Sequence, residues 1–120
     1  MRLPLTAVLS ILGCFYLSQA AECYAQSGGP NCVAGAPLLA FGNGWCNANF
    51  DAVQGGWSLF PDPAGKIADI GKIGVFPNAA TCIEAYNEIV NQCFNQSNGG
   101  SWTWAGVSLN INFCQWQASQ

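Results

Sequence analysis

Apolar residues recur at every third or fourth position between residues 79 and 93, which is the spacing of one face of a helix. This stripe consists of Ile83, Tyr86, Ile89, Val90 and Cys93. Asn78 precedes the stripe, and its side chain can accept hydrogen bonds from the free N–H groups of a first helical turn. The pattern therefore predicts a helix that is capped by Asn78 and ends near Cys93.

A strict alternation of apolar and polar residues marks the last part of the chain, which is typical of a strand with one buried face. The apolar positions are Val107, Leu109, Ile111 and Phe113, and the polar positions are Ser108, Asn110 and Asn112. A two-residue turn at Ala105-Gly106 would pair this strand with the preceding segment and place Trp102 and Trp104 on the apolar face. We therefore predict a two-stranded ribbon over residues 101–114.

A second helix and three short strands are predicted before these elements. Residues 22–26, 57–60 and 72–76 are interpreted as strands, and residues 66–70 stay undecided because isoleucines spaced by three conflict with nearby glycines. Pro37 suits the first turn of a helix, whose apolar side carries Leu38, Leu39, Phe41, Trp45 and Cys46. The order predicts an α+β fold, an α/β sandwich with two helices packed on an antiparallel sheet of about four to five short strands.

The first 20 residues have the pattern of a secretory signal peptide. Arg2 gives a positive start, residues 3–17 are mostly apolar, and Ser18 and Ala20 are the small residues before a cleavage site. The alternative is a membrane anchor, which is disfavoured because this run is shorter than the roughly 20 apolar residues needed to span a bilayer. We expect a signal peptide over residues 1–20, one disulfide-stabilised domain over residues 21–120, and a secreted, extracellular protein.

The chain has seven cysteines, of which Cys14 leaves with the signal peptide. The six that remain are an even number, which in an extracellular setting predicts three disulfides. The chain has no CxxC spacing, so the cysteines do not indicate a metal site. The six remaining cysteines are Cys23, Cys32, Cys46, Cys82, Cys93 and Cys114.

Two of these cysteines, Cys82 and Cys93, fall on nearly the same side of one predicted helix. At 1.5 Å per residue they are about 16 Å apart, which is too far for a bond between them. Our hypothesis is that they form two bridges to the cysteines that bracket the first helix, Cys32 and Cys46. That hypothesis leaves Cys23 to pair with the last cysteine of the chain.

Charge and composition exclude several classes of function. The net charge is −3, and it becomes −4 without Arg2, so a partner with a phosphate backbone or an anionic membrane surface is not expected. The chain has no histidine, which removes Ser-His and Cys-His nucleophile pairs and histidine-based metal sites. We expect no catalytic residue, no metal and no cofactor.

Five tryptophans in a small acidic domain favour a binding surface for a neutral ligand such as a carbohydrate. Aromatic rings stack on the C–H faces of sugars, and asparagine and aspartate side chains bond their hydroxyls. Trp45, Trp102 and Trp104 are interpreted as core residues, because aromatic residues dominate small cores. Trp57 and Trp116 are the better surface candidates.

The polar face of the predicted ribbon has two readings, a platform for ligand hydroxyls or an ordinary solvated sheet face. Under the first reading, Thr103, Ser108, Asn110 and Asn112 are candidate ligand-binding residues. Trp57 and Asp62, which lie outside the ribbon, are candidates as well. Asp62 and Asp69 could also be paired carboxylates for glycoside hydrolysis, but turn aspartates are usually structural. Asn95-Gln96-Ser97 is a sequon that predicts N-glycosylation at Asn95.

Several segments together resemble a family of small secreted cysteine-rich fungal proteins, typified by a glycan-binding lectin of the ink-cap mushroom. They are Cys23-Tyr24, Gly28-Gly29-Pro30, Trp45-Cys46-Asn47, Cys82-Ile83-Glu84-Ala85-Tyr86, Gly99-Gly100 before Trp102-Thr103, and the segment from Leu109 to Cys114. The resemblance implies a compact α/β sandwich, lectin-like binding of eukaryotic glycans without catalysis, and a homodimer that forms edge to edge. A similar architecture occurs in secreted killer toxins and effectors that act on host or competitor cells, which is the alternative function.

Overall fold

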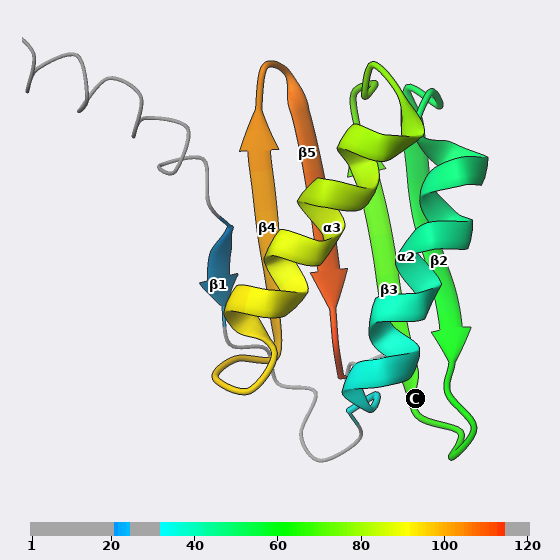
Figure 1. The fold of residues 1–120 in the computed structure, drawn as a ribbon, viewed down its shortest axis with the longest axis vertical. Coiled ribbons are helices and arrows are strands. Elements are labelled where there is room, and N and C mark those ends of the chain that lie inside the picture. The colour runs from blue at the N-terminus through cyan, green and yellow to red at the C-terminus, as the bar shows by residue number, and fades with distance from the viewer. Residues whose placement is uncertain (1–20, 25–31, 115–120) are drawn as a thin grey trace, which may run out of the picture.

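The computed structural model describes residues 21–24 and 32–114, which form one sheet with two helices on one of its faces (Figure 1). In chain order the elements are β1 (Glu22–Tyr24), α2 (Gly35–Asn49), β2 (Gln54–Pro61), β3 (Ile67–Ile73), α3 (Ala79–Cys93), β4 (Gly99–Trp104) and β5 (Val107–Asn112). The predicted signal peptide, the end of the first predicted strand and Trp116 lie outside the described residues.

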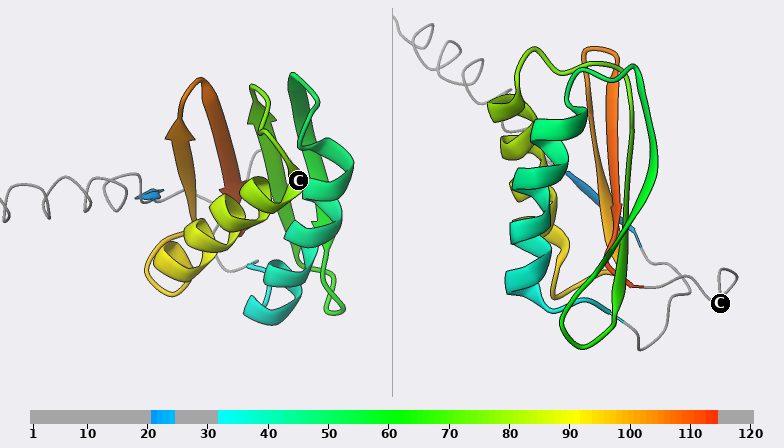
Figure 2. Two further views of the ribbon diagram at one scale, coloured as in Figure 1. Left: turned by 45° about the horizontal axis from the view of Figure 1, so that its top comes forward. Right: turned by 90° about the vertical axis from the view of Figure 1, so that its right-hand side faces the viewer.

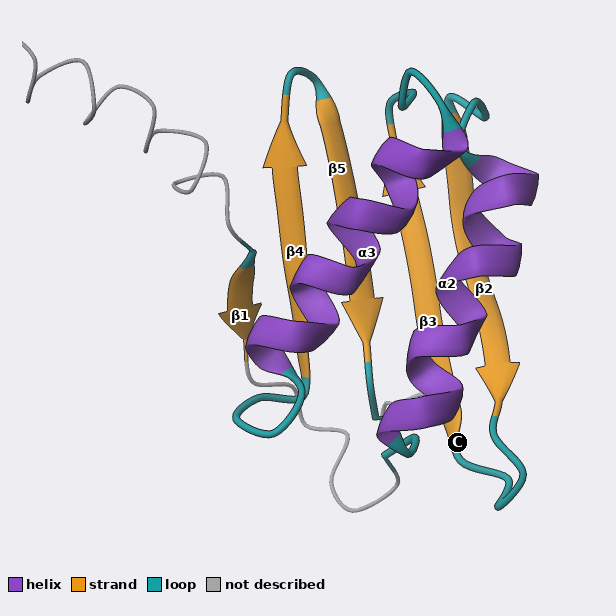
Figure 3. Ribbon diagram, in the orientation of Figure 1, coloured by secondary structure: helices purple, strands orange, loops and turns teal. Residues whose placement is uncertain are grey.

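The five described strands form a single sheet in the order β1-β4-β5-β3-β2, and each neighbouring pair is antiparallel. Both helices lie on the same side of this sheet (Figure 3). The predicted α+β class and its two-layer arrangement are therefore confirmed. The strand order also makes β1 and β2 the two edges of the described sheet.

The helix predicted after Asn78 is confirmed. The Asn78 side chain accepts a hydrogen bond from the Thr81 N–H at 2.8 Å, and the apolar stripe faces the core. The first helix is confirmed too, although Gly42 and Gly44 lower its intrinsic stability. Packing explains why residue 42 is a glycine, because a Cβ there would lie 2.3 Å from Cδ1 of the Tyr86 ring on α3.

The core fills the space between the helices and the sheet. From the sheet it takes the alternate residues of the central strands, among them Ile70, Leu109 and Ile111, none of which is exposed. The Trp45 indole on α2 donates to Ser58 Oγ on β2 at 3.1 Å and links the two layers. The Tyr86 hydroxyl on α3 donates to the Leu38 carbonyl on α2 at 2.6 Å and links the two helices. Nonpolar burial and these bonds together fix the helices over one face.

The strand predicted at residues 72–76 is wrong in its position. β3 runs over Ile67–Ile73 and includes most of the segment that the sequence left undecided. Pairing with β2 on one side and β5 on the other holds this segment extended despite Gly71. The strand ends at Gly74, whose φ of 92° breaks the extended conformation.

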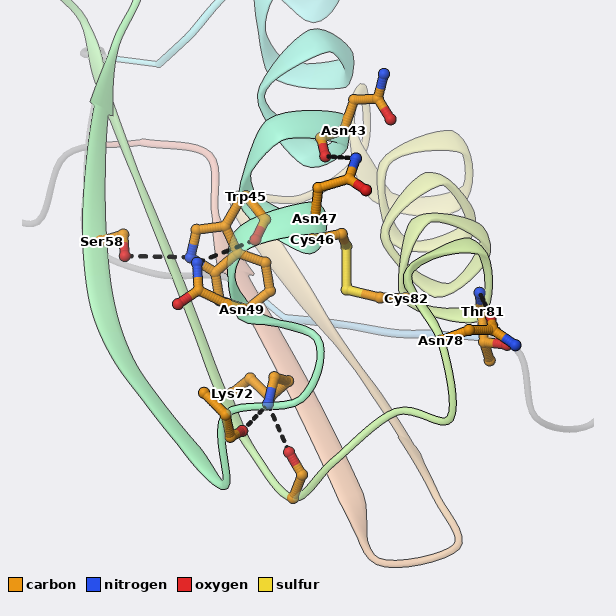
Figure 4. Close-up of a disulfide and its surroundings, with 12 residues drawn as sticks. Asn43, Trp45, Cys46, Asn47, Asn49, Ser58, Lys72, Asn78, Thr81 and Cys82 are labelled. Carbon is orange, nitrogen blue, oxygen red and sulfur yellow. Dashed lines mark hydrogen bonds between the residues drawn. A yellow bond between two sulfur atoms is a disulfide. The ribbon is translucent and has the colours of Figure 1, made fainter.

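Lys72 is one reason why the position of β3 was predicted wrongly, because it is a charged residue on the helix-covered side of this strand. Only 3% of its surface is exposed, and its ammonium group donates to the carbonyl oxygens of Ala52 and Gly74 (Figure 4). The bonds fasten the segment after α2 and the segment after β3 to the sheet. Burial lowers the pKa of Lys72, and the charge of Asp51 partly opposes this effect.

The two-residue turn between β4 and β5 is confirmed. Trp104 pairs with Val107 and Trp102 pairs with Leu109, which leaves Ala105 and Gly106 as the loop. Both loop residues have positive φ, as a twisted hairpin turn of this length requires. Trp102 is buried as expected, but Trp104 lies at the end of the sheet and is 49% exposed.

Three disulfides are confirmed, but two of the three predicted pairings are wrong. Cys46 bonds Cys82 and joins the end of α2 to the start of α3 (Figure 4). Cys93 bonds Cys23 on β1, and Cys32 bonds Cys114 beyond β5. The reason is the diagonal course of α3, whose start lies beside α2 and whose end lies over β1 and β4.

We predict that replacing both Cys46 and Cys82 with alanine destabilises the fold by about 3–4 kcal/mol. The bridge closes a loop with a sequence separation of 36, and its loss enlarges the conformational freedom of the unfolded chain. Urea denaturation of the oxidised protein and the double variant measures the difference. Equal midpoints for the two proteins would show that these cysteines do not form a bond that constrains the chain.

Candidate functional site

The side of the sheet that faces away from the helices is the main candidate surface. In the side view both helices lie on one side, and no described helix or strand covers the other (Figure 2). We call this side the open face. It is formed by Glu22, Tyr24, Trp57, Leu59, Asp69, Gly71, Ile73, Ser101, Thr103, Ser108, Asn110 and Asn112.

The open face has an apolar part on β2 and β3. Trp57, Leu59 and Ile73 have exposed fractions of 59%, 63% and 60%. Scattered exposed apolar residues are ordinary, but three large ones on adjacent strands make a contiguous patch. Such a patch favours contact with a ligand or partner that has apolar surface of its own.

The polar part of the open face lies on β4 and β5, beside the apolar part. Thr103 Oγ1 and Ser108 Oγ are 3.5 Å apart, and the Asn110 amide donates to Ser108 Oγ at 3.4 Å. These bonds are at the long limit for hydrogen bonds, so they constrain the side chains weakly. Hydroxyl and amide groups held in this way can exchange their partners for those of a ligand.

Register brings the two parts together at Gly71. Trp57 on β2 pairs with Gly71 on β3, and Gly71 pairs with Asn110 on β5. Adjacent strands are about 4.8 Å apart, so the backbones that carry the indole and the amide are separated by about 10 Å. Because Gly71 has no side chain, the side chains of Trp57 and Asn110 can extend over β3 at this position.

Asp69 lies one row away from Gly71, between Leu59 and Asn112. Burial raises the pKa of the Asp69 carboxyl above its ordinary value, and a hydrogen bond with the Asn112 side chain partly offsets the rise. The Tyr24 hydroxyl donates to Asn112 Oδ1 at 2.8 Å. Asn112 therefore links Tyr24 to Asp69 and positions a carboxylate in the middle of the open face.

Five of the six residues predicted to bind a ligand share the open face. They are Trp57, Thr103, Ser108, Asn110 and Asn112. Asn112 is only 3% exposed, so it can position Asp69 more readily than it can contact a ligand. Their role in binding stays a prediction.

Asp62 lies elsewhere, in the turn between β2 and β3. Its carboxylate accepts hydrogen bonds from the N–H groups of Ala34, Ala64 and Lys66, at 3.2, 2.9 and 2.9 Å. Burial acts to raise its pKa, but these backbone donors outweigh that effect and the pKa is lowered. Asp62 holds its turn against the start of α2, so it and Asp69 occupy different parts of the molecule.

Sequence reasoning did not propose Asp69, Leu59 or Ile73 for the open face. Residues 67–73 show no alternation of apolar and polar residues, because Ile67 and Ile73 on one face are as apolar as Ala68 and Ile70 on the other. The glycine at residue 71 and the lysine at residue 72 also made a strand harder to predict. The pairing of Asp69 with Asn112 depends on the register between β3 and β5, which the sequence does not give.

Within residues 21–24 and 32–114, no group of three or more histidine, cysteine, aspartate and glutamate side chains could hold a metal ion. In the same described ranges, no helix is both long enough and apolar enough to cross a membrane. The chemistry that the open face offers is therefore stacking and hydrogen bonding.

The chain matches a known protein family. The model of a family described as alpha-galactosyl binding lectin matches residues 35–117. These residues include both helices and four of the five described strands, and so most of the open face. No curated protein matches the chain.

We predict opposite effects on stability for Asp69→Asn and Asp62→Asn. Folding raises the pKa of Asp69, so the protonated form of this side chain contributes stability. The contribution is fully present below the unfolded pKa near 3.8 and is lost as pH rises through the folded pKa. Asp62 has a lowered pKa, so its contribution is present above 3.8 and is lost as pH falls. At neutral pH, Asp69→Asn should therefore raise the midpoint of urea denaturation, and Asp62→Asn should lower it.

Midpoints measured across acid and neutral pH check both signs. Each variant should approach the wild-type midpoint as pH falls through the pKa of the replaced carboxyl. A lower midpoint for Asp69→Asn at neutral pH would mean that its carboxylate is a structural group.

Proposed function

The chain belongs to the alpha-galactosyl binding lectin family, and we propose that it binds glycans with terminal α-galactosyl groups on its open face, without catalysis. The observation that carries this assignment is the combination of an exposed indole, a central carboxylate and neighbouring amide and hydroxyl groups. Trp57, Asp69 and Asn110 supply the first three on adjacent strands.

This combination suits the two kinds of surface on a galactosyl ring. One side of the ring presents C–H bonds, which can stack on the Trp57 indole. The hydroxyls at the rim can donate to the Asp69 carboxylate, and the Asn110 amide can both donate and accept. Bonds to a charged acceptor contribute more than neutral ones, about 1.5–3 kcal/mol against about 1 kcal/mol.

The positions of the acids support binding without hydrolysis. Glycosidases of the usual kind place two carboxyl groups about 5–9.5 Å apart across the scissile bond. The other acid of the described open face is Glu22 on β1, three strand spacings from β3, which is about 14 Å. Asp69 therefore has no catalytic partner among the described residues of this face and serves as a hydrogen-bond acceptor.

Export is part of the proposal. Three disulfides are compatible with an oxidising compartment, and the pattern of residues 1–20 supports a signal peptide. A secreted lectin meets its glycans outside the cell. In the alternative, an effector or killer-toxin-like protein, inhibition of cell growth would persist when free galactosides are present.

A homodimer is also proposed, through the outer edge of β2. The edge is unpaired among the described residues and carries Trp57 and Leu59 beside it, and open edges favour strand pairing. Light scattering of the mature protein should give twice the mass of one chain. A mass equal to one chain at the concentrations used for binding would contradict the dimer but not the assignment of the open face.

We predict that Trp57→Ala weakens binding to an α-galactosyl ligand about 30-fold, a loss of about 2 kcal/mol that is typical of a truncated tryptophan at a binding surface. Trp57 is exposed, so its replacement should leave the fold intact. Titration calorimetry with methyl α-galactoside measures the affinity of each variant.

The matched control is Trp104→Ala. Trp104 is also an exposed tryptophan, but it lies on the helix side of the sheet, opposite the open face. We expect its replacement to change the affinity by less than about twofold. Equal losses for the two variants, or a loss for Trp104→Ala alone, would contradict the assignment.

A further inference from the structure

The loop after α3 carries the sequon Asn95-Gln96-Ser97, which the proposed ligand site does not use. Asn95 is exposed and lies two residues beyond the end of the helix. The N–H groups of Gln96 and Ser97 both donate to the Cys93 carbonyl, at 3.1 and 2.9 Å. The sequon therefore sits in a tight turn that keeps the Asn95 side chain at the surface.

A hollow of about 200 Å³ lies beside Asn95, where the start of α2 and the end of α3 diverge. Leu39 and Phe94 form its apolar part, and Asn91, Gln92 and Gln96 form its polar part. Leu39 is 40% exposed, which is high for a leucine beside a core. The lining is thus of the mixed kind that can contact a sugar ring.

Phe94 is held in place on both sides. Its ring lies so close to Gly35 that a Cβ at that position would be 3.2 Å from Cε2 of the ring. On the other side, its centroid is 5.8 Å from that of Phe113. A fixed aromatic ring next to a sequon is a ready surface for the first sugar of an attached glycan.

We propose that Asn95 is N-glycosylated in the exported protein and that the first N-acetylglucosamine lies in this hollow against Leu39 and Phe94. The donor is an oligosaccharide linked to a polyprenyl diphosphate. Asn95 Nδ2 forms a bond to C1 of the sugar as the bond from C1 to the phosphate oxygen breaks. The polyprenyl diphosphate leaves with the bonding electron pair, and Nδ2 releases one proton to a base of the transferase.

The glycan and the proposed ligand occupy opposite sides of the molecule. The hollow is lined by residues of the two helices and of the loop that follows α3, whereas the open face is the other side of the sheet (Figure 2). Glycosylation therefore covers exposed apolar surface on the helix layer and leaves the open face accessible. The proposal rests on export and does not depend on the identity of the ligand.

Secretion of the full-length chain from a yeast host tests the modification. Peptide mass mapping should find a glycan on Asn95, and peptide N-glycosidase should remove it and leave aspartate at that position. Asn95→Gln and Ser97→Ala should each abolish the glycan, whereas Ser97→Thr should retain it. Asn91→Gln is the matched control and should retain the glycan, because Asn91 lines the same hollow but lies outside the sequon. Secreted wild-type protein with unmodified Asn95 would overturn the proposal.

Trimming the glycan tests the place of the first sugar. An endoglycosidase that leaves one N-acetylglucosamine should give a protein with a higher Tm than Asn95→Asp, which has the same chain as the fully deglycosylated form. In Leu39→Ser this difference in Tm should disappear. Equal Tm values for the one-sugar form and Asn95→Asp would overturn the contact with the hollow. Binding to an α-galactosyl resin should be the same for all these forms, so a loss of binding in every one of them would count against the proposed function alone.

Discussion

The disulfide between Cys46 and Cys82 holds the two helices of this protein together as one layer. It joins the end of α2 to the start of α3, and both sulfur-bearing residues are completely buried. The other two bridges fasten α3 to the edge strand β1 and the segment before α2 to the segment after β5. A chain of this size buries only about two-thirds of its surface, so covalent links of this kind supply stability that a small core lacks.

Holding both helices on one face has a direct consequence for the other face. The side chains that alternate toward the helices form the core, and those that alternate away from them remain accessible on the open face. Trp57, Leu59 and Ile73 stay exposed there, and Asp69 keeps a carboxylate partly removed from water. Each of these features is unfavourable for an unliganded surface, and together they are what an amphipathic sugar ring would contact. In this account, structural stability comes from one side of the sheet and binding from the other.

The elements with a clear periodicity were predictable from the sequence. The helix after Asn78 and the ribbon that ends the described chain depend on local spacing, which tertiary contacts reinforce. The strand Ile67–Ile73 was not predicted in full, because Gly71 and the buried Lys72 interrupt its apolar pattern and pairing on both sides overrides the local preference.

Disulfide partners were harder still. Cys82 and Cys93 share one side of α3, but the helix crosses the sheet diagonally and takes them to different neighbours. Asp69 could be assigned to the candidate site only once the register of β3 against β5 was known. Asn110 and Ser108 were already visible in the sequence as the polar side of an alternating strand.

The central claim is that the open face, and not the helix layer, contacts an α-galactosyl group. The most direct measurement is a titration of nitrogen-15-labelled mature protein with methyl α-galactoside, followed by NMR. The account predicts that the largest shifts occur at the Trp57 indole N–H, the Gly71 amide and the Asn110 side-chain amide. Shifts confined to α2 and α3, or shifts that leave these three groups unchanged while the ligand binds, would contradict it.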